Sequence, residues 1–244
     1  MNRFFLSPAC FQPGEVIFDP ETSRQVSRVL RLRAGDRVIT LDGTGEEYLL
    51  ELQQVSKSSI TGKILTHQMT KSEPRVNLTI LVGLTQREKF EWVLQKCTEI
   101  GCAAFTPVIT SRSLVQDIRS AEQKIERWQQ ILREAAEQSG RGRIPVLNPP
   151  VLFLQALEQL RGFDLGLVAY EMERTKTIKK MLRGFKGESL GILIGPEGGL
   201  SEEEAQRTKQ GGINLVSLGA RTLRMETAAI VASTLILHQL KSLD

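Results

Sequence analysis

The sequence has few of the residues that build cross-linked or metal-held domains. It contains three cysteines, Cys10, Cys97 and Cys102, and two histidines, His67 and His238. An odd and sparse set of cysteines does not form a disulfide framework and is typical of a reducing compartment. Because the two histidines also lack the spacing of metal ligands, we expect no bound metal.

Long apolar runs are lacking as well. The most apolar stretch begins at Glu226 and is interrupted by Ser233 and Thr234, so it is too short and too polar to span a bilayer. The first residues lack the apolar stretch and the small-residue cleavage site of a signal peptide. These observations predict a cytoplasmic protein that does not interact with a membrane.

The basic residues are distributed unevenly. The 244 residues carry a net charge of +4, and the composition, 41% hydrophobic and 25% charged, is that of an ordinary globular protein. Between Arg24 and Arg37 five arginines stand against one acid, so this window alone carries +4. A local excess predicts a surface for a polyanion, and solvated surface is the alternative. The predicted RNA-binding residues are Arg24, Arg28, Arg31 and Arg33.

Residues 1–72 have the pattern of a small β-rich domain. Three short segments are predicted strands: 37–41, 47–52 and 59–65. Asp42-Gly43 between the first two is a turn signal, and one helix is predicted over 20–32 with basic residues on one face. The polar segment 70–74 predicts a linker, so we place the domain boundary between residues 72 and 73.

Residues 73–244 alternate between strands and helices. The predicted strands are 77–82, 104–109, 165–169, 190–194 and 214–218. The predicted helices are 88–100, 118–138, 151–160, 177–182, 201–210 and 226–240. This alternation favours an α/β domain with a parallel sheet that is covered by helices on both faces.

The sharpest local signal is the segment 190–204. An apolar strand ends at Gly195, a loop rich in glycine and proline follows, and Ser201 with Glu204 forms a capping box that begins the next helix. This order is typical of a ligand pocket at the carboxyl ends of parallel strands. Four carboxylates around the loop disfavour a phosphate, whereas S-adenosylmethionine carries a sulfonium and fits. An ordinary turn before a capped helix is the alternative.

A second strand ends in the same manner at Gly219. A short loop with Arg221 and Arg224 then leads into a helix with Glu226 in its first turn, where an acid suits the helix dipole. The two arginines either hold a target nucleotide or pair with Glu197 and Glu226. Small residues in this helix allow a close approach, either within the core or with a second subunit.

These segments together resemble the SPOUT methyltransferases, and among them the RsmE type, which methylates N3 of uracil in ribosomal small-subunit RNA. The segments that carry the resemblance are 28–33, 95–101, 110–113, 134–141, 195–199 (Gly-Pro-Glu-Gly-Gly) and 218–228. The family often has a histidine pair before the first of these segments. This chain has Arg24 and Gln25 nearby instead, which puts the detailed RNA contacts of the first domain in doubt.

The resemblance implies a fold and a function. Residues 1–72 are expected to form a PUA-like RNA-binding β-barrel, and residues 73–244 a SPOUT methyltransferase domain with a deep trefoil knot, in a homodimer. The implied reaction is the S-adenosylmethionine-dependent methylation of N3 of a uridine in 16S ribosomal RNA, within the small subunit. Two alternatives remain: a methyltransferase that acts on a ribose 2′-hydroxyl or a tRNA base, and a non-catalytic RNA-binding protein.

The resemblance also implies the residues of the site. The expected cofactor-binding residues are Val168, Tyr170, Leu193, Gly195, Pro196, Glu197, Gly198, Gly199, Leu218, Gly219, Leu223, Arg224 and Thr227. We expect arginines to stabilise negative charge that develops on the uracil oxygens, while solvent or a carboxylate accepts the N3 proton. The candidates are Arg112, Arg141 and Arg224, for which phosphate binding or ion pairing is the alternative.

Overall fold

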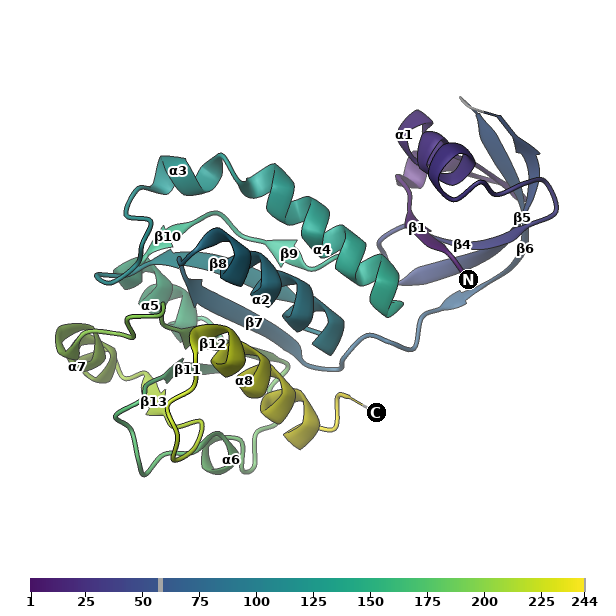
Figure 1. The fold of residues 1–244 in the computed structure, drawn as a ribbon. Helices are drawn as coiled ribbons and strands as arrows, with labels where there is room; N and C mark the ends of the chain where they lie inside the picture. The colour runs from purple at the N-terminus through teal and green to yellow at the C-terminus, as the bar shows by residue number, and fades with distance from the viewer. Residues whose placement is uncertain (57–58, 244) are drawn as a thin grey trace. The chain divides into compact units, whose positions relative to one another are not determined.

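The computed structural model describes residues 1–56 and 59–243 (Figure 1). The chain forms two compact units, one of Met1–Glu73 with Ala136–Ile144 and the other of Pro74–Ala135 with Pro145–Asp244. Nothing in the sequence pattern indicated that 136–144 packs with the first unit. The boundary predicted between residues 72 and 73 therefore omits this segment.

The first unit is built on a six-stranded sheet. Its strands are β1 (Arg3–Phe5), β2 (Phe11–Gln12), β3 (Glu15–Ile17), β4 (Arg37–Leu41), β5 (Glu46–Val55) and β6 (Ile60–Met69), in the order β1-β4-β5-β6-β3-β2. β1 and β4 are parallel and the other pairs antiparallel. The three predicted strands are β4, β5 and β6. The strands before them are too short to leave a pattern of alternation. Val16, Val38 and Leu50 are fully buried in the core of this unit.

The predicted helix over 20–32 is shorter than expected. After the 3₁₀ turn η1 (Pro8–Cys10), α1 (Pro20–Arg24) begins at Asp19, whose carboxylate accepts a hydrogen bond from the Thr22 N–H at 2.9 Å. The helix continues as one π-helical turn, η2 (Gln25–Val29). Arg31 follows in the left-handed conformation with φ 55°, so it lies beyond the end of the helix.

The second unit contains a sheet of seven parallel strands, as the alternation of strands and helices predicted. They are β7 (Asn77–Gly83), β8 (Ala104–Ile109), β9 (Val146–Leu147), β10 (Val151–Leu152), β11 (Leu165–Ala169), β12 (Ser189–Ile194) and β13 (Asn214–Val216). The order is β10-β8-β7-β12-β11-β13, and β9 pairs with β8. All five predicted strands are present. The short β9 and β10 were missed, and β10 occupies the start of the helix predicted over 151–160.

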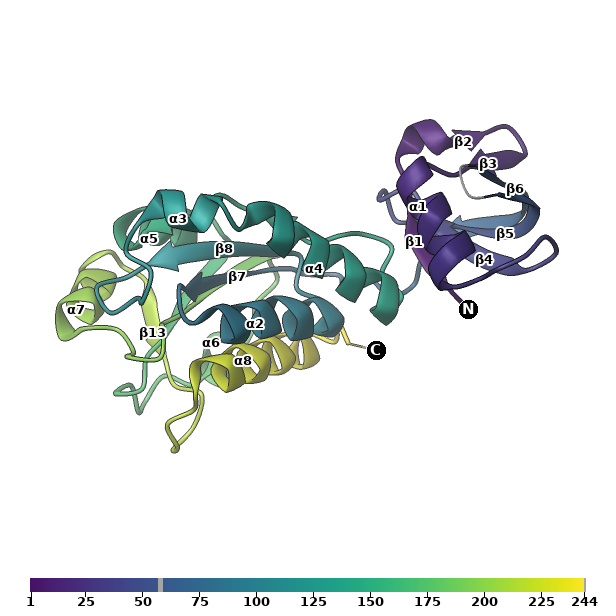
Figure 2. The same ribbon diagram turned by 45° about the horizontal axis from the view of Figure 1, so that its top comes forward.

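Helices cover both faces of this sheet (Figures 1 and 2). They are α2 (Arg87–Ile100), α3 (Ile118–Glu122), α4 (Ile125–Ser139), α5 (Phe153–Arg161), α6 (Ile178–Met181), α7 (Glu202–Gln210) and α8 (Met225–Gln239). α2 packs against α8, and α8 against β7 and β12, while α5 lies on the opposite face. The helix predicted over 118–138 is divided into α3 and α4. No helix in the described parts of the chain has the length and apolar character needed to cross a membrane.

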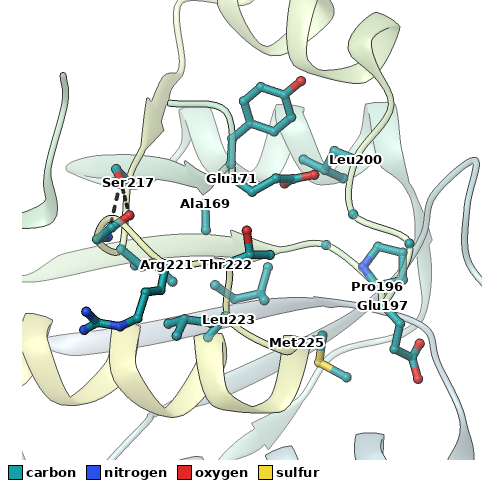
Figure 3. Close-up of a pocket in the computed structure, with 18 residues that line it drawn as sticks. Ala169, Glu171, Pro196, Glu197, Leu200, Ser217, Arg221, Thr222, Leu223 and Met225 are labelled. Atoms are coloured by element: carbon teal, nitrogen blue, oxygen red, sulfur yellow. Dashed lines mark hydrogen bonds between the residues drawn. The ribbon is translucent and has the colours of Figure 1, made fainter. Parts of the chain in front are cut away.

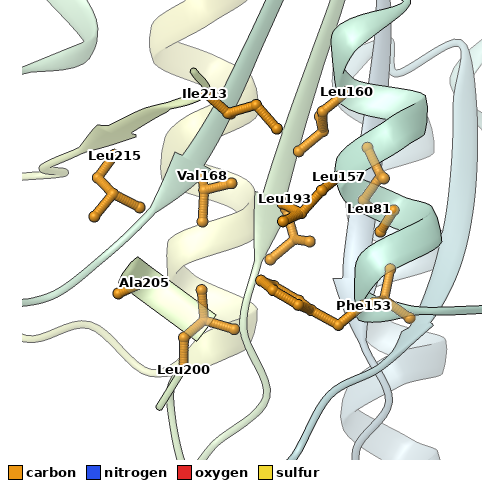
Figure 4. Packing of buried hydrophobic residues seen from close by; sticks show 12 residues of the cluster. Leu81, Phe153, Leu157, Leu160, Val168, Leu193, Leu200, Ala205, Ile213 and Leu215 are labelled. Atoms are coloured by element: carbon orange, nitrogen blue, oxygen red, sulfur yellow. The ribbon is translucent and has the colours of Figure 1, made fainter. Parts of the chain in front are cut away.

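A hydrophobic core cluster lies between the sheet and α5 (Figure 4). Phe153, Leu157 and Leu160 on one side of α5 pack with the strand residues Val168 and Leu193. The side chain at 154 points the other way, since residues three apart, not one apart, share a helix face. This cluster fixes the strands whose ends carry the site.

Replacement of Leu157, 3% exposed, should therefore destabilise the fold. We expect Leu157→Ala to lower the free energy of unfolding by about 2 to 5 kcal/mol, because it leaves a cavity in the core. Leu154→Ala, on the same helix but 51% exposed, should change it by less than about 0.5 kcal/mol. Denaturation in guanidinium chloride measures both, and equal effects would contradict this account of the core.

Candidate active site

A pocket lies at the carboxyl ends of β11, β12 and β13 (Figure 3). Three chain segments form it: 169–171 after β11, 194–200 after β12 and 217–228 after β13. Parallel strands end at the same edge of a sheet, so the loops that follow them meet there. The pocket therefore contains both of the glycine-terminated strand ends that the sequence singled out.

The loop after β12 is a tight turn that brings its backbone to the pocket. The Gly199 N–H donates to the Pro196 carbonyl at 2.8 Å, and Gly199 has φ +67°. This positive φ favours glycine, and a Cβ at Gly199 would lie 2.6 Å from a carboxylate oxygen of Glu171, so the Glu171 side chain would have to move. The predicted capping box is confirmed: the Glu204 N–H donates to Ser201 Oγ at 3.2 Å, and the Ser201 N–H donates to the Glu204 carboxylate at 2.9 Å.

Neighbouring elements hold this loop in place. The Glu197 carboxylate accepts hydrogen bonds from the Thr85 hydroxyl and, at 3.0 Å, from Lys89 Nζ at the start of α2. On the other side of the loop, the Arg112 guanidinium donates to the Gly198 carbonyl at 2.8 Å. The loop is thus fixed by side chains that follow β7 and β8.

The carboxylates around the loop are arranged differently from the sequence expectation. Glu204 is buried in the capping box, Glu203 pairs with Arg207 on α7, and Glu197 points away from the centre of the pocket (Figure 3). A further carboxylate lines the pocket beside the loop, that of Glu171, two residues after the end of β11. Sequence reasoning missed Glu171, although its position right after a buried strand was a usable signal.

The wall formed after β13 combines an anchored turn with apolar side chains. Ser217 Oγ accepts a hydrogen bond from the Gly219 N–H and donates to the Gly219 carbonyl, both at 3.2 Å. Gly219 has φ +134°, a conformation that other residues rarely adopt. Leu218 lines the pocket as well, and Leu223 and Met225 extend its apolar surface (Figure 3). Such a surface suits a flat ring, with backbone groups of the facing loop available for polar contacts.

The two arginines after β13 differ in position. Arg221 lines the pocket, on the side opposite Glu197 (Figure 3), whereas Arg224 is the N-cap residue of α8 and does not line it. Glu197 pairs with Lys89, and within the described residues neither arginine has a carboxylate partner. The predicted alternative of pairing with Glu197 and Glu226 is therefore not realised in this structure.

Tyr170 separates the pocket from the core. Its ring packs against the hydrophobic cluster between α5 and the sheet. The pKa of its hydroxyl is raised, first because of burial and then because Glu171 and Glu202 lie nearby. Arg112 lies close enough to oppose that shift. Polar and charged side chains therefore surround this end of the pocket, while its opposite wall is apolar.

Most, but not all, of the predicted cofactor-binding residues line the pocket. Those that do are Tyr170, Gly195, Pro196, Glu197, Gly198, Gly199, Leu218, Gly219 and Leu223. Val168 and Leu193 do not, because successive strand side chains point to opposite faces and theirs enter the core; Ala169 and Ile194 line the pocket instead. Arg224 and Thr227 lie on exposed positions beside lining residues.

The three arginines predicted to act in catalysis lie in different places. Arg112 binds the loop after β12, as described above. Arg141 belongs to the first unit, is 3% exposed and donates to both carboxylate oxygens of Glu73 at 3.3 and 2.7 Å. Arg141 is not among the residues that line the pocket, and its guanidinium is used by the buried pair with Glu73. In the described parts of the chain, acidic, histidine and cysteine side chains form no cluster able to hold a metal.

Comparison with known proteins agrees with this geometry. A model of the RNA methyltransferase domain matches residues 71–237, and a model of the RNA methyltransferase PUA domain matches residues 28–65. The chain is 37% identical to the ribosomal RNA small subunit methyltransferase E of Bacillus subtilis, over 98% of this chain and 97% of that protein. Identity to the protein of the same name from Synechocystis is 33%, over 94% and 75% of the two chains.

A solved structure gives the same result. The ribosomal RNA small subunit methyltransferase E from Neisseria gonorrhoeae, in a crystal structure bound to S-adenosylmethionine, is 30% identical, with a TM-score of 0.86. The similarity covers 97% of this chain and 96% of that one. Because the matches extend along almost the whole chain and include all three segments of the pocket, the protein belongs to the RNA methyltransferase family of the ribosomal RNA small subunit methyltransferases E.

Proposed function

We propose that this protein transfers the methyl group of S-adenosylmethionine to N3 of a uridine in 16S ribosomal RNA of the small subunit. The observation that carries the proposal is the pocket of three loops at the ends of β11, β12 and β13, in a chain of this family. The N. gonorrhoeae relative is bound to the same cofactor, and the names of the relatives specify small-subunit ribosomal RNA. The choice of uridine N3 rests on the resemblance of the sequence motifs.

The residues of the pocket fit the proposed cofactor. The backbone of 195–199 approaches the cavity closely because Gly199 leaves no side chain there, and the apolar wall opposite it suits an adenine ring. The Glu171 carboxylate has no ion-pair or hydrogen-bond partner in the described parts of the chain. A free carboxylate at the wall favours a ligand with positive charge, such as a sulfonium with an α-ammonium group.

The chemistry required of the protein is modest. S-adenosylmethionine supplies a methyl group that is already activated by its sulfonium. The chain must align uracil N3 with that methyl group, which is a large proximity effect. It must also stabilise negative charge on the uracil oxygens, a role we assign to Arg224 with Arg221, and direct the N3 proton to a base. We propose Glu171 as that base, whose carboxylate would accept the N3 proton. The bond from N3 to the methyl carbon would form as the bond from that carbon to the sulfonium sulfur breaks, and the sulfur would leave as a neutral thioether.

The remaining arginines have separate proposed roles. Arg112 is proposed to act mainly by positioning the loop after β12, through its bond to the Gly198 carbonyl. A catalytic role for Arg141 stays a prediction, which its buried pair with Glu73 does not support. In the first unit, Arg24, Arg28, Arg31 and Arg33 are all exposed and, in the described part of this unit, have no carboxylate partner for their side chains. We propose that they bind the RNA backbone.

The finer features of the architecture are also proposals. We infer a PUA-like barrel for residues 1–72 and a methyltransferase domain for 73–244 with a trefoil knot, supported by the return of the chain from β13 to α8 beside β7 and β12. A homodimer is supported by exposed apolar side chains on two helices that pack together: Leu235 on α8 is 42% exposed and Trp92 on α2 is 43% exposed. We place the enzyme in the cytoplasm, where ribosomal subunits assemble.

Methylation of small-subunit RNA tests the function directly. The purified protein, labelled S-adenosylmethionine and unmodified small ribosomal subunits should give N3-methyluridine, identified by mass spectrometry of nucleosides. The 16S transcript alone serves as a second substrate. If the label were found on a ribose 2′-hydroxyl, or if tRNA offered as a substrate were labelled instead, the acceptor would not be uridine N3 of 16S ribosomal RNA. Absence of cofactor binding in calorimetry would indicate a non-catalytic RNA-binding protein.

Two single replacements test the assigned roles at saturating cofactor. Arg224→Ala should lower kcat about 10²-fold, because a positive charge near the developing negative charge is lost. Glu171→Gln should lower kcat by a similar factor, because the amide cannot accept the proton. Arg119→Ala, an exposed arginine on α3, is the control and should retain the normal rate. A normal rate in either test variant contradicts its role.

The close approach of the loop after β12 to β7 gives a further prediction. A Cβ at Gly83 would lie 2.5 Å from the Pro196 nitrogen and 2.9 Å from the Gly195 carbonyl carbon, so Gly83→Ala must displace the loop. We expect cofactor affinity to fall about tenfold or more, measured by calorimetry on folded protein. Gly162→Ala, where the nearest atom is a carbonyl oxygen at 3.3 Å, is the matched control. Unchanged affinity for Gly83→Ala would show that the loop position does not matter for binding.

A further inference from the structure

A second basic segment follows β11, in the second unit, which contains the pocket. Between residues 174 and 186 the chain has six basic residues and no acid, so this segment carries more positive charge than the whole protein, whose net charge is +4. The six residues are Arg174, Lys176, Lys179, Lys180, Arg183 and Lys186. In the rest of the chain, outside this segment and the 24–37 window, acidic residues therefore outnumber basic ones. The excess of basic residues is thus confined to two segments.

The fold presents these charges outward. Ile178 and Leu182 lie four residues apart, so they share one side of the short helix α6, and both are 3% exposed. α6 packs against α8. All six basic side chains are exposed. The two apolar residues thus anchor the segment and leave its charged side to solvent.

The charges are not neutralised within the described parts of the chain. Lys176 Nζ donates to the Asn214 side-chain oxygen at 2.9 Å, and Lys180 Nζ donates to the Thr175 carbonyl at 2.9 Å, and neither partner is a carboxylate. Glu173, the acid directly before the segment, is used by the turn itself. Its carboxylate accepts hydrogen bonds from Thr175 and from three successive backbone N–H groups, which lower its pKa to about 2.

The basic segment is joined to the rim of the pocket. Thr177 forms a parallel bridge with Ser217, and the Ser217 N–H donates to the Lys176 carbonyl at 2.7 Å. Ser217 lines the pocket. We propose that residues 174–186 bind the phosphate backbone of the substrate RNA on the catalytic unit and hold the strand whose base enters the pocket. This inference rests on the proposed function, and it adds a second RNA-binding surface to the one on the first unit.

The occupant is RNA rather than a membrane surface. A helix that binds a membrane interface exposes an apolar face next to its cations, with enough length to insert that face. Here Ile178 and Leu182 are turned inward against α8, and α6 spans only Ile178–Met181. Exposed cations without exposed apolar partners match a highly charged, hydrated polyanion.

The test is the salt dependence of RNA binding. The variant Lys179→Gln with Arg183→Gln removes two of the cations without touching the pocket. Each lost phosphate contact should reduce the slope of log affinity against log salt by about 0.7 to 0.9, so the slope should fall by roughly 1.4 to 1.8. The probe is a 16S ribosomal RNA transcript, and the full-length protein is titrated between 50 and 200 mM salt. Over that range the wild type should lose roughly tenfold more affinity than the variant.

The matched control removes the same charges elsewhere on the unit. Arg119→Gln with Lys124→Gln, in and just after α3, should leave the slope unchanged. Calorimetry with S-adenosylmethionine and the methylation assay on wild type report on the proposed function separately, since RNA binding is measured without turnover. Equal slopes for the α6 variant, the control and the wild type would overturn the inference. So would binding of the wild type, lost in the α6 variant, to anionic phospholipid vesicles and not to RNA.

Discussion

The site depends on a backbone contact that leaves no room for a side chain. Where β7 ends, Gly83 lies so close to the loop after β12 that a Cβ would meet the Pro196 nitrogen at 2.5 Å. The two strands are hydrogen-bonded neighbours in the sheet, so their ends bring this loop and the start of α2 together. Lys89 and Thr85 then hold Glu197 from the α2 side. The order of the strands in the sheet therefore determines where the loop after β12 lies, and that loop forms one side of the pocket.

A rigid loop of this kind suits a reaction in which the donor is already activated. Proximity depends on how accurately two groups are held, and a displacement of about 1 Å is enough to cost a large part of it. The loop is fixed at both ends, by the capping box of α7 and by the contact at Gly83, while Arg112 binds its middle at Gly198. The side chains that hold this loop from outside the pocket, Thr85, Lys89 and Arg112, come from the segments that follow β7 and β8.

Local features of the fold could be predicted from the sequence, and pairings across the chain could not. The capping box at Ser201 and the strand that ends at Gly195 are encoded by adjacent residues, so their patterns were sufficient. The choice between Val168 and Ala169 depends on which face of β11 meets α5, and alternation alone does not decide that. The ion pair of Arg141 with Glu73 joins residues far apart in sequence. For the same reason the segment 136–144 could not be assigned to the first unit.

The distribution of charge explains how one protein can accept a cationic donor and a polyanionic acceptor. Glu171 is beside the loop inside the pocket, and the carboxylates of Glu197 and Glu204 are satisfied by protein donors, so the cavity itself presents an acidic side chain and no buried cation to the ligand. The cations are Arg221, an exposed residue of the pocket lining, and the basic side chains of 174–186, a segment joined to the lining residue Ser217. Screening in water confines each charge to its surroundings within about 8 to 10 Å, so the two signs act on different parts of the substrates. Had the acids and bases been interspersed, they would have paired with one another, and neither the sulfonium nor the phosphates would meet a free partner.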